Sequence, residues 1–338
     1  MSIAAGFRLL WGGYVLAREG VFGIVPLDGA PASARFAVRT IRLLERRGVK
    51  SREMAHNLSQ AMDKLGPSYV KLGQFLATRA DVVGEDVAAE LAALQDQVPP
   101  VPDDVARASV ASALGAPVDE IFAEFGPSIA AASIAQVHRA KLVDAKGARS
   151  VAVKVLRPGV QRRFEKDLES YYVAARMVER FVKSARRLRP IAVVDTLAES
   201  VRFEMDFRLE AAAISEMAEN TRGDLGFRVP SVEWARTART ILTMEWIEGI
   251  KLSRPAEMAA AGHNVPQLGR FVLQTFLRHA VRDGFFHADM HQGNLFVEPD
   301  GTLVAVDFGI TSRLSREERG VLAQILFGFI QRDYRRVA

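Results

Sequence analysis

Residues 285–297 read FFHADMHQGNLFV. Four polar side chains stand within eight positions of this otherwise apolar stretch: His287, Asp289, His291 and Asn294. The helix-ending signal RDG precedes the stretch and strand-like residues follow it, so the polar side chains are expected on a loop. Three interpretations are open: a metal site, a phosphate-transfer site, or a polar turn without chemistry.

A zinc site would pair His287 with His291, which are four residues apart. That spacing brings two imidazoles together on a helix, but it has no special geometry on a loop. The glutamate of a zinc-protease motif is also missing. The sequence therefore disfavours a metal hydrolase.

The phosphate-transfer interpretation predicts further residues elsewhere in the chain, and the sequence contains them. His287, Asp289 and Asn294 match the kinase-like catalytic-loop pattern H-x-D-x-x-x-x-N. Eighteen residues past Asp289, the stretch VAVDFG places Asp307 at the end of an expected strand, and a hairpin around EPDG joins the two motifs. Carboxylate and amide oxygens suit Mg²⁺ and, through it, phosphate oxygens. The two motifs together indicate phosphoryl transfer.

The nucleotide side of such a site is expected upstream. In SVAVKV, residues 150–155, strand alternation puts Lys154 on the face opposite three valines. A lysine in an apolar strand needs a partner, and nucleotide phosphates would provide one; an edge-strand lysine reaching solvent is the alternative. Glu210, at the head of a helical run, is the expected carboxylate partner. The strand TILTMEWIEG would lead to a hinge, where backbone groups from Glu245 to Ile247 could bind adenine.

The loop before the lysine strand departs from the kinase pattern. A kinase has glycines there, so that backbone N–H groups can close over the phosphates. This chain has Ala130, Ala131, Ala132 and Ser133. Alanine disfavours positive φ and adds a methyl group where the backbone approaches the nucleotide. The loop is expected to lie over the phosphates but to hold them differently.

The ordered motifs AAASIAQVH, VAVKV, EMDFRLEA, FHADMHQGN and DFG resemble those of the UbiB (ABC1/ADCK) atypical protein-kinase-like family, in particular its bacterial ubiquinone-biosynthesis members. KLGQFLATRADVV, residues 71–83, is similar to that family's KxGQ motif. The resemblance runs from about residue 60 to the C-terminus. It implies an α+β fold, kinase-like with two lobes. Residues 1–105 would form an all-helical N-terminal extension, 106–250 the N-lobe and 251–338 part of the C-lobe.

The resemblance also implies roles for individual residues. Lys154 would contact the nucleotide phosphates and pair with Glu210, and Asp289 would be the catalytic-loop carboxylate. Asn294 and Asp307 would hold Mg²⁺, so the implied cofactors are ATP or ADP with Mg²⁺.

The KxGQ motif implies a cover over this site. Lys71 and Gln74 would extend over the active site, with Lys71 facing Glu204 and Asp206. In the family such a cover goes with ATPase or small-molecule phosphorylation chemistry rather than phosphorylation of proteins in trans.

Two departures from the family pattern stand out. Met290 and Gln292 occupy positions where many members carry proline, which is expected to change the stiffness of the loop but not its ligands. The chain stops at RDYRRVA, one helix past Asp-Phe-Gly, whereas members continue and bacterial ones usually end in membrane-spanning segments. A C-terminally truncated chain is therefore expected.

The expected function is a kinase-like ATPase or small-molecule kinase that supports ubiquinone (coenzyme Q) biosynthesis. It would act at the cytoplasmic side of the bacterial inner membrane, peripherally or anchored through a C-terminal segment absent from this chain. Its partners would be membrane lipid, a polyprenylated ubiquinone precursor or the enzymes that modify it. A non-catalytic nucleotide-binding scaffold is the alternative, favoured by the alanine-rich loop and disfavoured by the complete catalytic set. A direct polyprenylphenol hydroxylase is less favoured, because the chain has no G-x-G-x-x-G fingerprint or suitable iron-binding pair.

Composition limits the remaining possibilities. The chain has 338 residues, 49% of them apolar, and a net charge of +5, which is too small to indicate nucleic acid as a partner. The absence of cysteine excludes disulfides and thiolate metal sites. The apolar N-terminal stretch is interrupted by charges, so it is not expected to span a bilayer. Its Trp11 and Tyr14 would suit a membrane interface, and packing against the rest of the protein is an equal alternative.

Overall fold

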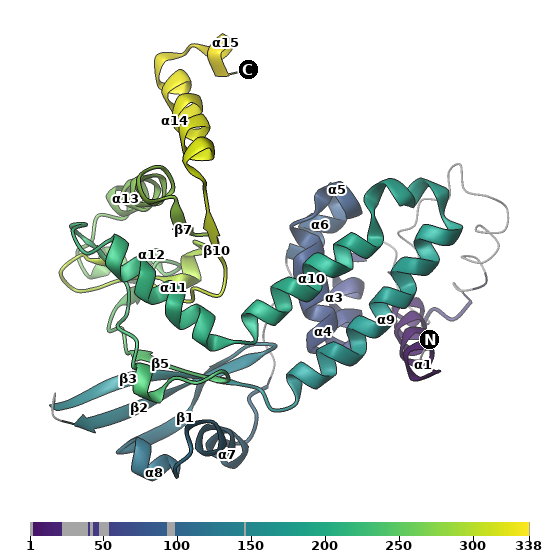
Figure 1. Cartoon of the computed structure of the whole chain (residues 1–338), viewed down its shortest axis with the longest axis horizontal. Coiled ribbons are helices and arrows are strands. Elements are labelled where there is room, and N and C mark those ends of the chain that lie inside the picture. The colour runs from purple at the N-terminus through teal and green to yellow at the C-terminus, as the bar shows by residue number, and fades with distance from the viewer. Residues whose placement is uncertain are drawn as a thin grey trace. The chain divides into compact units, whose positions relative to one another are not determined.

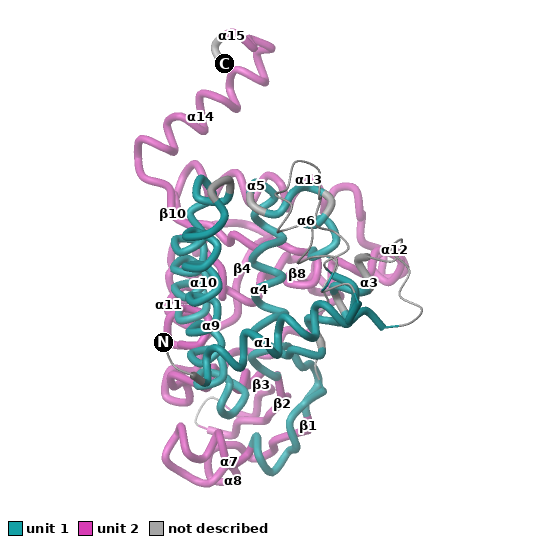
Figure 2. Tube along the Cα trace, turned by 90° about the vertical axis from the view of Figure 1, so that its right-hand side faces the viewer, with its two compact units in different colours: residues 1–106, 128–136, 156–202 teal, residues 107–127, 137–155, 203–338 magenta. Residues whose placement is uncertain are grey.

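The computed structural model describes residues 3–21, 40, 43–46, 54–92, 99–144 and 147–337 (Figure 1). The fold is mixed α+β, as predicted. The chain divides into two compact units, coloured in Figure 2. Unit 1 comprises residues 1–106, 128–136 and 156–202, and unit 2 comprises residues 107–127, 137–155 and 203–338. The three sequence-based segments stay predictions.

Unit 1 is mainly helical in its described part. Its helices are α1 (Ile3–Arg18), α3 (Met54–Leu65), α4 (Pro67–Ala77), α5 (Ala80–Val83), α6 (Glu85–Ala92), α9 (Val160–Phe181) and α10 (Pro190–Glu204), with a 3₁₀ turn η2 (Lys183–Leu188). Helix α4 starts at a left-handed Gly66 (φ 96°) followed by proline at the first helical position. It packs on α9, where the rings of Tyr69 and Tyr171 meet edge to face at 5.3 Å.

Helix α1 packs on α9 and α3 within unit 1. Ala5 and Ala17 lie buried on its packed face, whereas Phe7, Leu10 and Trp11 are each more than 60% exposed. The packing alternative for this segment is therefore confirmed, and the membrane-interface alternative stays a prediction for the exposed stripe. Among the described residues, no helix is long and apolar enough to span a bilayer.

The first sheet has the strand order β1-β2-β3-β5. Its strands are β1 (Glu124–Ala131), β2 (Ala135–Asp144), β3 (Gly147–Leu156) and β5 (Ile241–Glu245). Val151, Val153 and Val155 of β3 are fully buried in a core shared with α7 (Asp103–Leu114) and α8 (Val118–Ile121). The predicted alternation is confirmed, because Lys154 points to the opposite face.

A second sheet of order β4-β9-β8-β6 and a two-stranded ladder of β7 and β10 complete the strands of unit 2. The strands are β4 (Phe227–Arg228), β6 (Ile250–Lys251), β7 (Phe285–His287), β8 (Leu295–Val297), β9 (Leu303–Ala305) and β10 (Thr311–Arg313). The helices and single turns around them are α11 (Phe207–Asn220), η3 (Trp234–Arg236), α12 (Pro255–Ala260), α13 (Val265–Arg278), η4 (His279–Asp283), η5 (Gln292–Asn294), α14 (Arg316–Gln331) and α15 (Tyr334–Val337). The predicted EPDG hairpin is confirmed, with Val297 opposite Leu303.

Two chain segments run side by side between the sheets of unit 2. The segment after β4 joins β5, because the Glu233 amide donates to Thr243 O (2.9 Å) and the Glu245 amide donates to Ser231 O (2.8 Å). The segment after β5 runs through Gly249 into β6, which pairs with β8. A Cβ atom on Gly249 would lie only 2.8 Å from Val297 O. The hinge therefore consists of two chain segments, and its backbone at Gly249 packs closely against β8.

Replacing Gly249 with alanine should destabilise the protein by about 1–3 kcal/mol, because the backbone of β8 must shift to admit the methyl group. Urea unfolding of the whole chain measures this. The control is Gly269→Ala inside α13, where a Cβ meets open space. That change should raise stability by roughly 0.5–1 kcal/mol. Equal effects of the two substitutions would contradict the close approach at the hinge.

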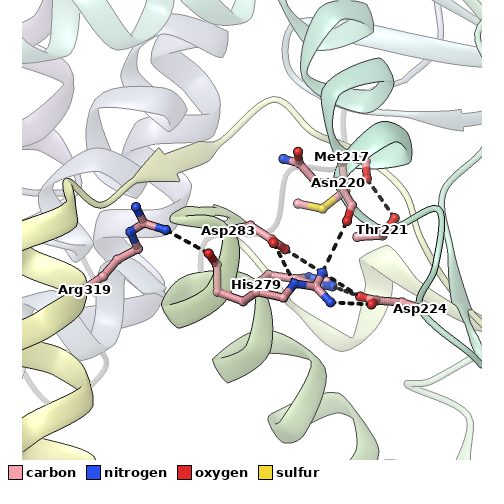
Figure 3. A network of polar contacts seen from close by, with 8 residues as sticks. Met217, Asn220, Thr221, Asp224, His279, Asp283 and Arg319 are labelled. Carbon is pink, nitrogen blue, oxygen red and sulfur yellow. Dashed lines mark hydrogen bonds and ion pairs between the residues drawn. The ribbon is translucent and has the colours of Figure 1, made fainter.

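A network of ion pairs ties the end of α11 to the π-helical turn η4 (Figure 3). The Arg282 guanidinium contacts both carboxylate oxygens of Asp224 (2.5 and 3.0 Å) and the Asn220 carbonyl oxygen (3.3 Å). His279 Nε2 lies 3.1 Å from Asp224 Oδ2, and the imidazole is buried. Burial lowers the pKa of His279 against the opposing effect of Asp224. The contact is therefore a hydrogen bond from a neutral imidazole.

The buried His279 predicts a loss of stability in acid. Its pKa is lowered from the ordinary 6.5 on folding, so the unfolded chain takes up the proton first as pH falls below 6.5. The unfolding free energy of the native protein should therefore drop between pH 6.5 and 5 more steeply than that of His279→Gln. The same change at the partly exposed His263 is the control. Parallel curves for the native protein and His279→Gln would contradict this assignment.

Candidate functional site

The side chain of Lys154 lies between two carboxylates in unit 2. Its Nζ is 3.0 Å from both Glu210 oxygens and 3.0 Å from Asp307 Oδ1. Lys154 and Glu210 are largely buried, with side chains 14% and 5% exposed, while that of Asp307 is 50% exposed. Three segments far apart in sequence thus meet at one ammonium group.

Helix α11 places Glu210 at this point. Asp206 caps the helix by accepting from the Arg208 amide (3.2 Å), as expected for an N-cap carboxylate. Glu210 stands in the first turn, on the same buried stripe as Ala211 and Ile214. The ring of Phe207 lies under the ammonium, with Lys154 Nζ 5.3 Å from the ring centre.

The Asp-Phe-Gly turn has an unusual backbone. Asp307 has φ 62°, a left-handed conformation that is uncommon outside glycine. Phe308 next to it is buried, and its ring centre lies 4.7 Å from that of His287. This packing fixes the turn, so the carboxylate of Asp307 points toward Lys154.

The catalytic loop is bonded directly to this turn. His287 Nε2 donates to Val306 O (3.1 Å), and its Nδ1 accepts from the Asp289 amide (3.0 Å). The Val306 amide donates to Asn294 O (2.9 Å), and Asn294 Nδ2 donates to Asp289 Oδ2 (3.2 Å). Both ring nitrogens of His287 are therefore used in shaping the loop. His291 has a similar local role, since its Nδ1 accepts from the Gly293 amide (3.1 Å).

The two carboxylates beside Lys154 differ in burial, because the side chain of Glu210 is 5% exposed and that of Asp307 is 50% exposed. Burial raises the pKa of Glu210 to about 7, against the opposing pull of Lys154. The charge of Lys154 holds the pKa of Asp307 below its usual range. Burial disfavours the charge on Lys154, but Asp307 and Glu210 outweigh it and raise the pKa of the ammonium. The half-exposed Asp307 therefore stays ionised, and Glu210 is the carboxylate that titrates near neutrality.

The donor set fits Mg²⁺. Asp307 and Asn294 offer a carboxylate and an amide oxygen on segments joined by the Val306–Asn294 hydrogen bond, and hard oxygens of this kind are its preferred protein ligands. In the described part of the chain, no group of three or more His, Cys, Asp or Glu side chains could hold a metal. A magnesium ion here would therefore need phosphate oxygens or water to complete its coordination.

The remaining predicted residues lie in unit 1 or at the hinge. Residues 130–133 run from the end of β1 into the turn before β2, which is closed by the Ala132 amide donating to Ala135 O (2.8 Å), and none of the four has a positive φ. Lys71 and Gln74 lie one turn apart on α4, both partly exposed. Residues 130–133, Lys71 and Gln74 belong to unit 1, whereas Lys154 belongs to unit 2. The cover of Lys71 and Gln74 over the site therefore stays a prediction.

At the hinge, the Glu245 amide is already bonded to Ser231 O (2.8 Å). The expected binding of adenine would then use the Glu245 carbonyl oxygen or the backbone of the buried Ile247. The Glu245 side chain is held by Arg228, whose Nη2 lies 2.9 Å from Glu245 Oε1 and 2.7 Å from Glu298 Oε1. The sequence does not single out Arg228. Its one available signal was an arginine next to a short β run, and that pattern is too common to single it out.

Removing the Lys154 ammonium should be costly. We expect Lys154→Met to destabilise the protein by about 3–5 kcal/mol at pH 8.5, because it leaves Glu210 buried without its cation. On folding, the pKa of Glu210 rises from its ordinary 4.5, so native stability is lost as pH rises from 4.5 through about 7. Without Lys154 that pKa rises further and the loss extends to higher pH. The cost should therefore be smaller at pH 6, where Glu210 is protonated.

Urea unfolding at both pH values measures this effect. The control is Lys141→Met on β2, a half-exposed lysine whose partner Glu124 is also exposed. An exposed pair of this kind contributes only about 0–1 kcal/mol. A cost for Lys154→Met that matches the control, or that does not change with pH, would refute the buried charge pair.

Comparisons with known proteins indicate the family of the chain. The model of the ABC1 atypical kinase-like domain matches residues 93–338. A protein named "Probable protein kinase UbiB" from Marinobacter nauticus is 40% identical over 286 residues, which cover 83% of this chain and 52% of that protein. A protein of the same name from Aeromonas salmonicida is 37% identical over 329 residues, covering 96% of this chain and 60% of that protein. The chain thus spans about half to three fifths of the length of these curated relatives.

A solved structure also matches. It is described as the complex structure of Rv3197-erythromycin from Mycobacterium tuberculosis, and it aligns with a TM-score of 0.52 and 26% identity. The alignment covers 90% of this chain and 74% of that one, which supports the α+β kinase-like fold. Because the family model covers well over half of the residues, the chain belongs to the ABC1 atypical kinase-like family.

Proposed function

We propose that this chain binds ATP or ADP with Mg²⁺ and catalyses ATP hydrolysis or phosphoryl transfer to a small molecule. The observation that carries the proposal is the position of Lys154 Nζ, 3.0 Å from both Glu210 and Asp307. A lysine held by a helix carboxylate and facing the Asp-Phe-Gly aspartate is the arrangement that kinase-like enzymes use for nucleotide phosphates.

Each residue of the site has a part in this chemistry. Lys154, oriented by Glu210, would bind the nucleotide phosphates. Asp307 and Asn294 would hold Mg²⁺, which supplies charge neutralisation for the developing phosphoryl transition state. Asp289, fixed by the amide of Asn294, would orient the attacking water or hydroxyl and accept its proton.

The pathway and place of action are inferred from the relatives. The curated relatives are named as UbiB proteins, and we propose a supporting role in ubiquinone biosynthesis at the cytoplasmic side of the inner membrane. The substrate or regulator would be a polyprenylated phenol precursor, a membrane lipid or an enzyme that modifies the precursor. The exposed apolar stripe of α1 suits contact with lipid, because aromatic and aliphatic side chains favour the membrane interface.

The first test is Mg²⁺-dependent nucleotide binding measured by thermal shift. At a ligand concentration 100 times Kd, linkage predicts a gain of about 2.7 kcal/mol in stability. The gain should require Mg²⁺, and Asp307→Asn should abolish it because the substitution removes a metal ligand. The control is Asp119→Asn, the same change at an 85% exposed side chain of unit 2.

The outcomes separate the possible functions. A folded native protein without any shift would refute nucleotide binding. A shift together with phosphate release that depends on Asp289 would support an ATPase or kinase. A shift without turnover, also in the presence of polyprenylphenols, would favour the scaffold alternative over catalysis.

A further inference from the structure

A second ion pair joins the two segments that meet at Lys154. Glu216 of α11 and Arg313 of β10 form a two-pronged contact, with Arg313 Nη1 2.6 Å from Glu216 Oε1 and Nη2 bonded to Oε2. Arg313 also lies over the ring of Phe285, its Cζ 4.6 Å from the ring centre. The planar guanidinium is thus fixed by stacking as well as by hydrogen bonds.

This pair lies on the same two segments as the site residues Glu210 and Asp307. Glu216 follows Glu210 by six residues on α11, and Arg313 follows Asp307 by six residues. The same two segments are therefore joined twice, once through Lys154 and once through the Glu216–Arg313 pair. Arg313 is also opposite Phe285 in the β7–β10 ladder, and β7 ends at His287 of the catalytic loop.

Nucleotide binding would affect the link through Lys154 and the link through the Glu216–Arg313 pair differently. If Asp307 turns to a magnesium ion, its bond to Lys154 is lost and the first link opens. The Glu216–Arg313 pair involves neither Lys154 nor Asp307, and its side chains are 35% and 66% exposed. It can keep α11 and β10 together while the first link is open.

We propose that Glu216 and Arg313 are positioning residues that hold Glu210 and Asp307 in register when Mg²⁺ and nucleotide are bound. This inference rests on the proposed nucleotide-binding function. Neither residue would touch the nucleotide, and both would act through α11 and β10. The phosphates could then bind to a Lys154 that Glu210 still orients.

The test is a double-mutant cycle on the full chain with Glu216→Gln, Arg313→Gln and the double variant. We expect each single change to raise the Kd of Mg-ADP about two- to fivefold, the range expected for an exposed ion pair. The double variant should be no worse than either single one, because both remove the same contact. Without metal, the Kd of ADP should change less, since Asp307 then stays on Lys154. Isothermal titration with and without Mg²⁺ measures all four proteins.

A matched control is available at the C-terminal end of the same helix. Glu219 pairs with Arg222, and both are more than 60% exposed, but this pair connects only neighbouring residues. The Glu219→Gln and Arg222→Gln variants should leave Kd unchanged. Equal effects of the two cycles, or additive effects at Glu216 and Arg313, would overturn the proposal.

A second measurement does not depend on nucleotide. Hydrogen exchange of the amides in residues 210–220 should become faster in Glu216→Gln and Arg313→Gln, and stay unchanged in the control variants. If the native protein fails to bind nucleotide while this exchange is faster, the proposed function is wrong but α11 is held as described. If exchange is unchanged in all variants, the pair does not hold the helix and the inference fails.

Discussion

The ammonium group of Lys154 is the interaction on which the rest of unit 2 depends. It lies at 3.0 Å from carboxylates on α11 and on the Asp-Phe-Gly turn, and its own strand belongs to the first sheet. A buried carboxylate such as Glu210 is tolerated only with a cation beside it. Strand β3, helix α11 and the Asp-Phe-Gly turn must therefore each bring one side chain to the same point. This explains why α11 is capped, pinned at its end by Arg282 and packed along its whole buried stripe.

Much of this arrangement could be predicted from sequence because it is encoded locally. The alternation around Lys154, the cap before Glu210 and the hairpin after Asn294 each depend on residues within a few positions. The order of the motifs then indicated which of these elements meet. Other contacts depend on partners far apart in the chain, as with Arg228 and Glu298 or Arg313 and Glu216, 70 and 97 residues apart. The residues next to an arginine in the sequence do not indicate which distant carboxylate it will bind, so these pairs were not predicted.

The helical segment that ends at RDG illustrates a different limit. Helix α13 ends at Arg278 and continues as a π-helical turn from His279 to Asp283. Periodicity cannot distinguish a π turn from a helix, because the turn adds one residue without a change in composition. Here the wider turn brings His279 and Arg282 to the same partner, Asp224. His279 Nε2 and Arg282 Nη2 both contact Asp224 Oδ2.

The hinge and the loop of alanines limit motion in different ways. In ordinary kinases a glycine-rich loop covers the nucleotide phosphates, and a few hinge residues absorb the change in backbone angles when an enzyme closes. Here the turn at residues 130–133 has no positive φ, and two segments cross the hinge, bonded to each other at Glu245 and Ser231. Arg228 also links the two sheets, because it lies on β4 and its guanidinium binds the carboxylate of Glu245 at the end of β5. Within unit 2, the sheets that carry Lys154 and the catalytic loop are therefore fixed by covalent and ionic links together. Adjustment to a bound nucleotide would then occur by exchange of partners at Lys154 and Asp307 rather than by rotation of one sheet against the other.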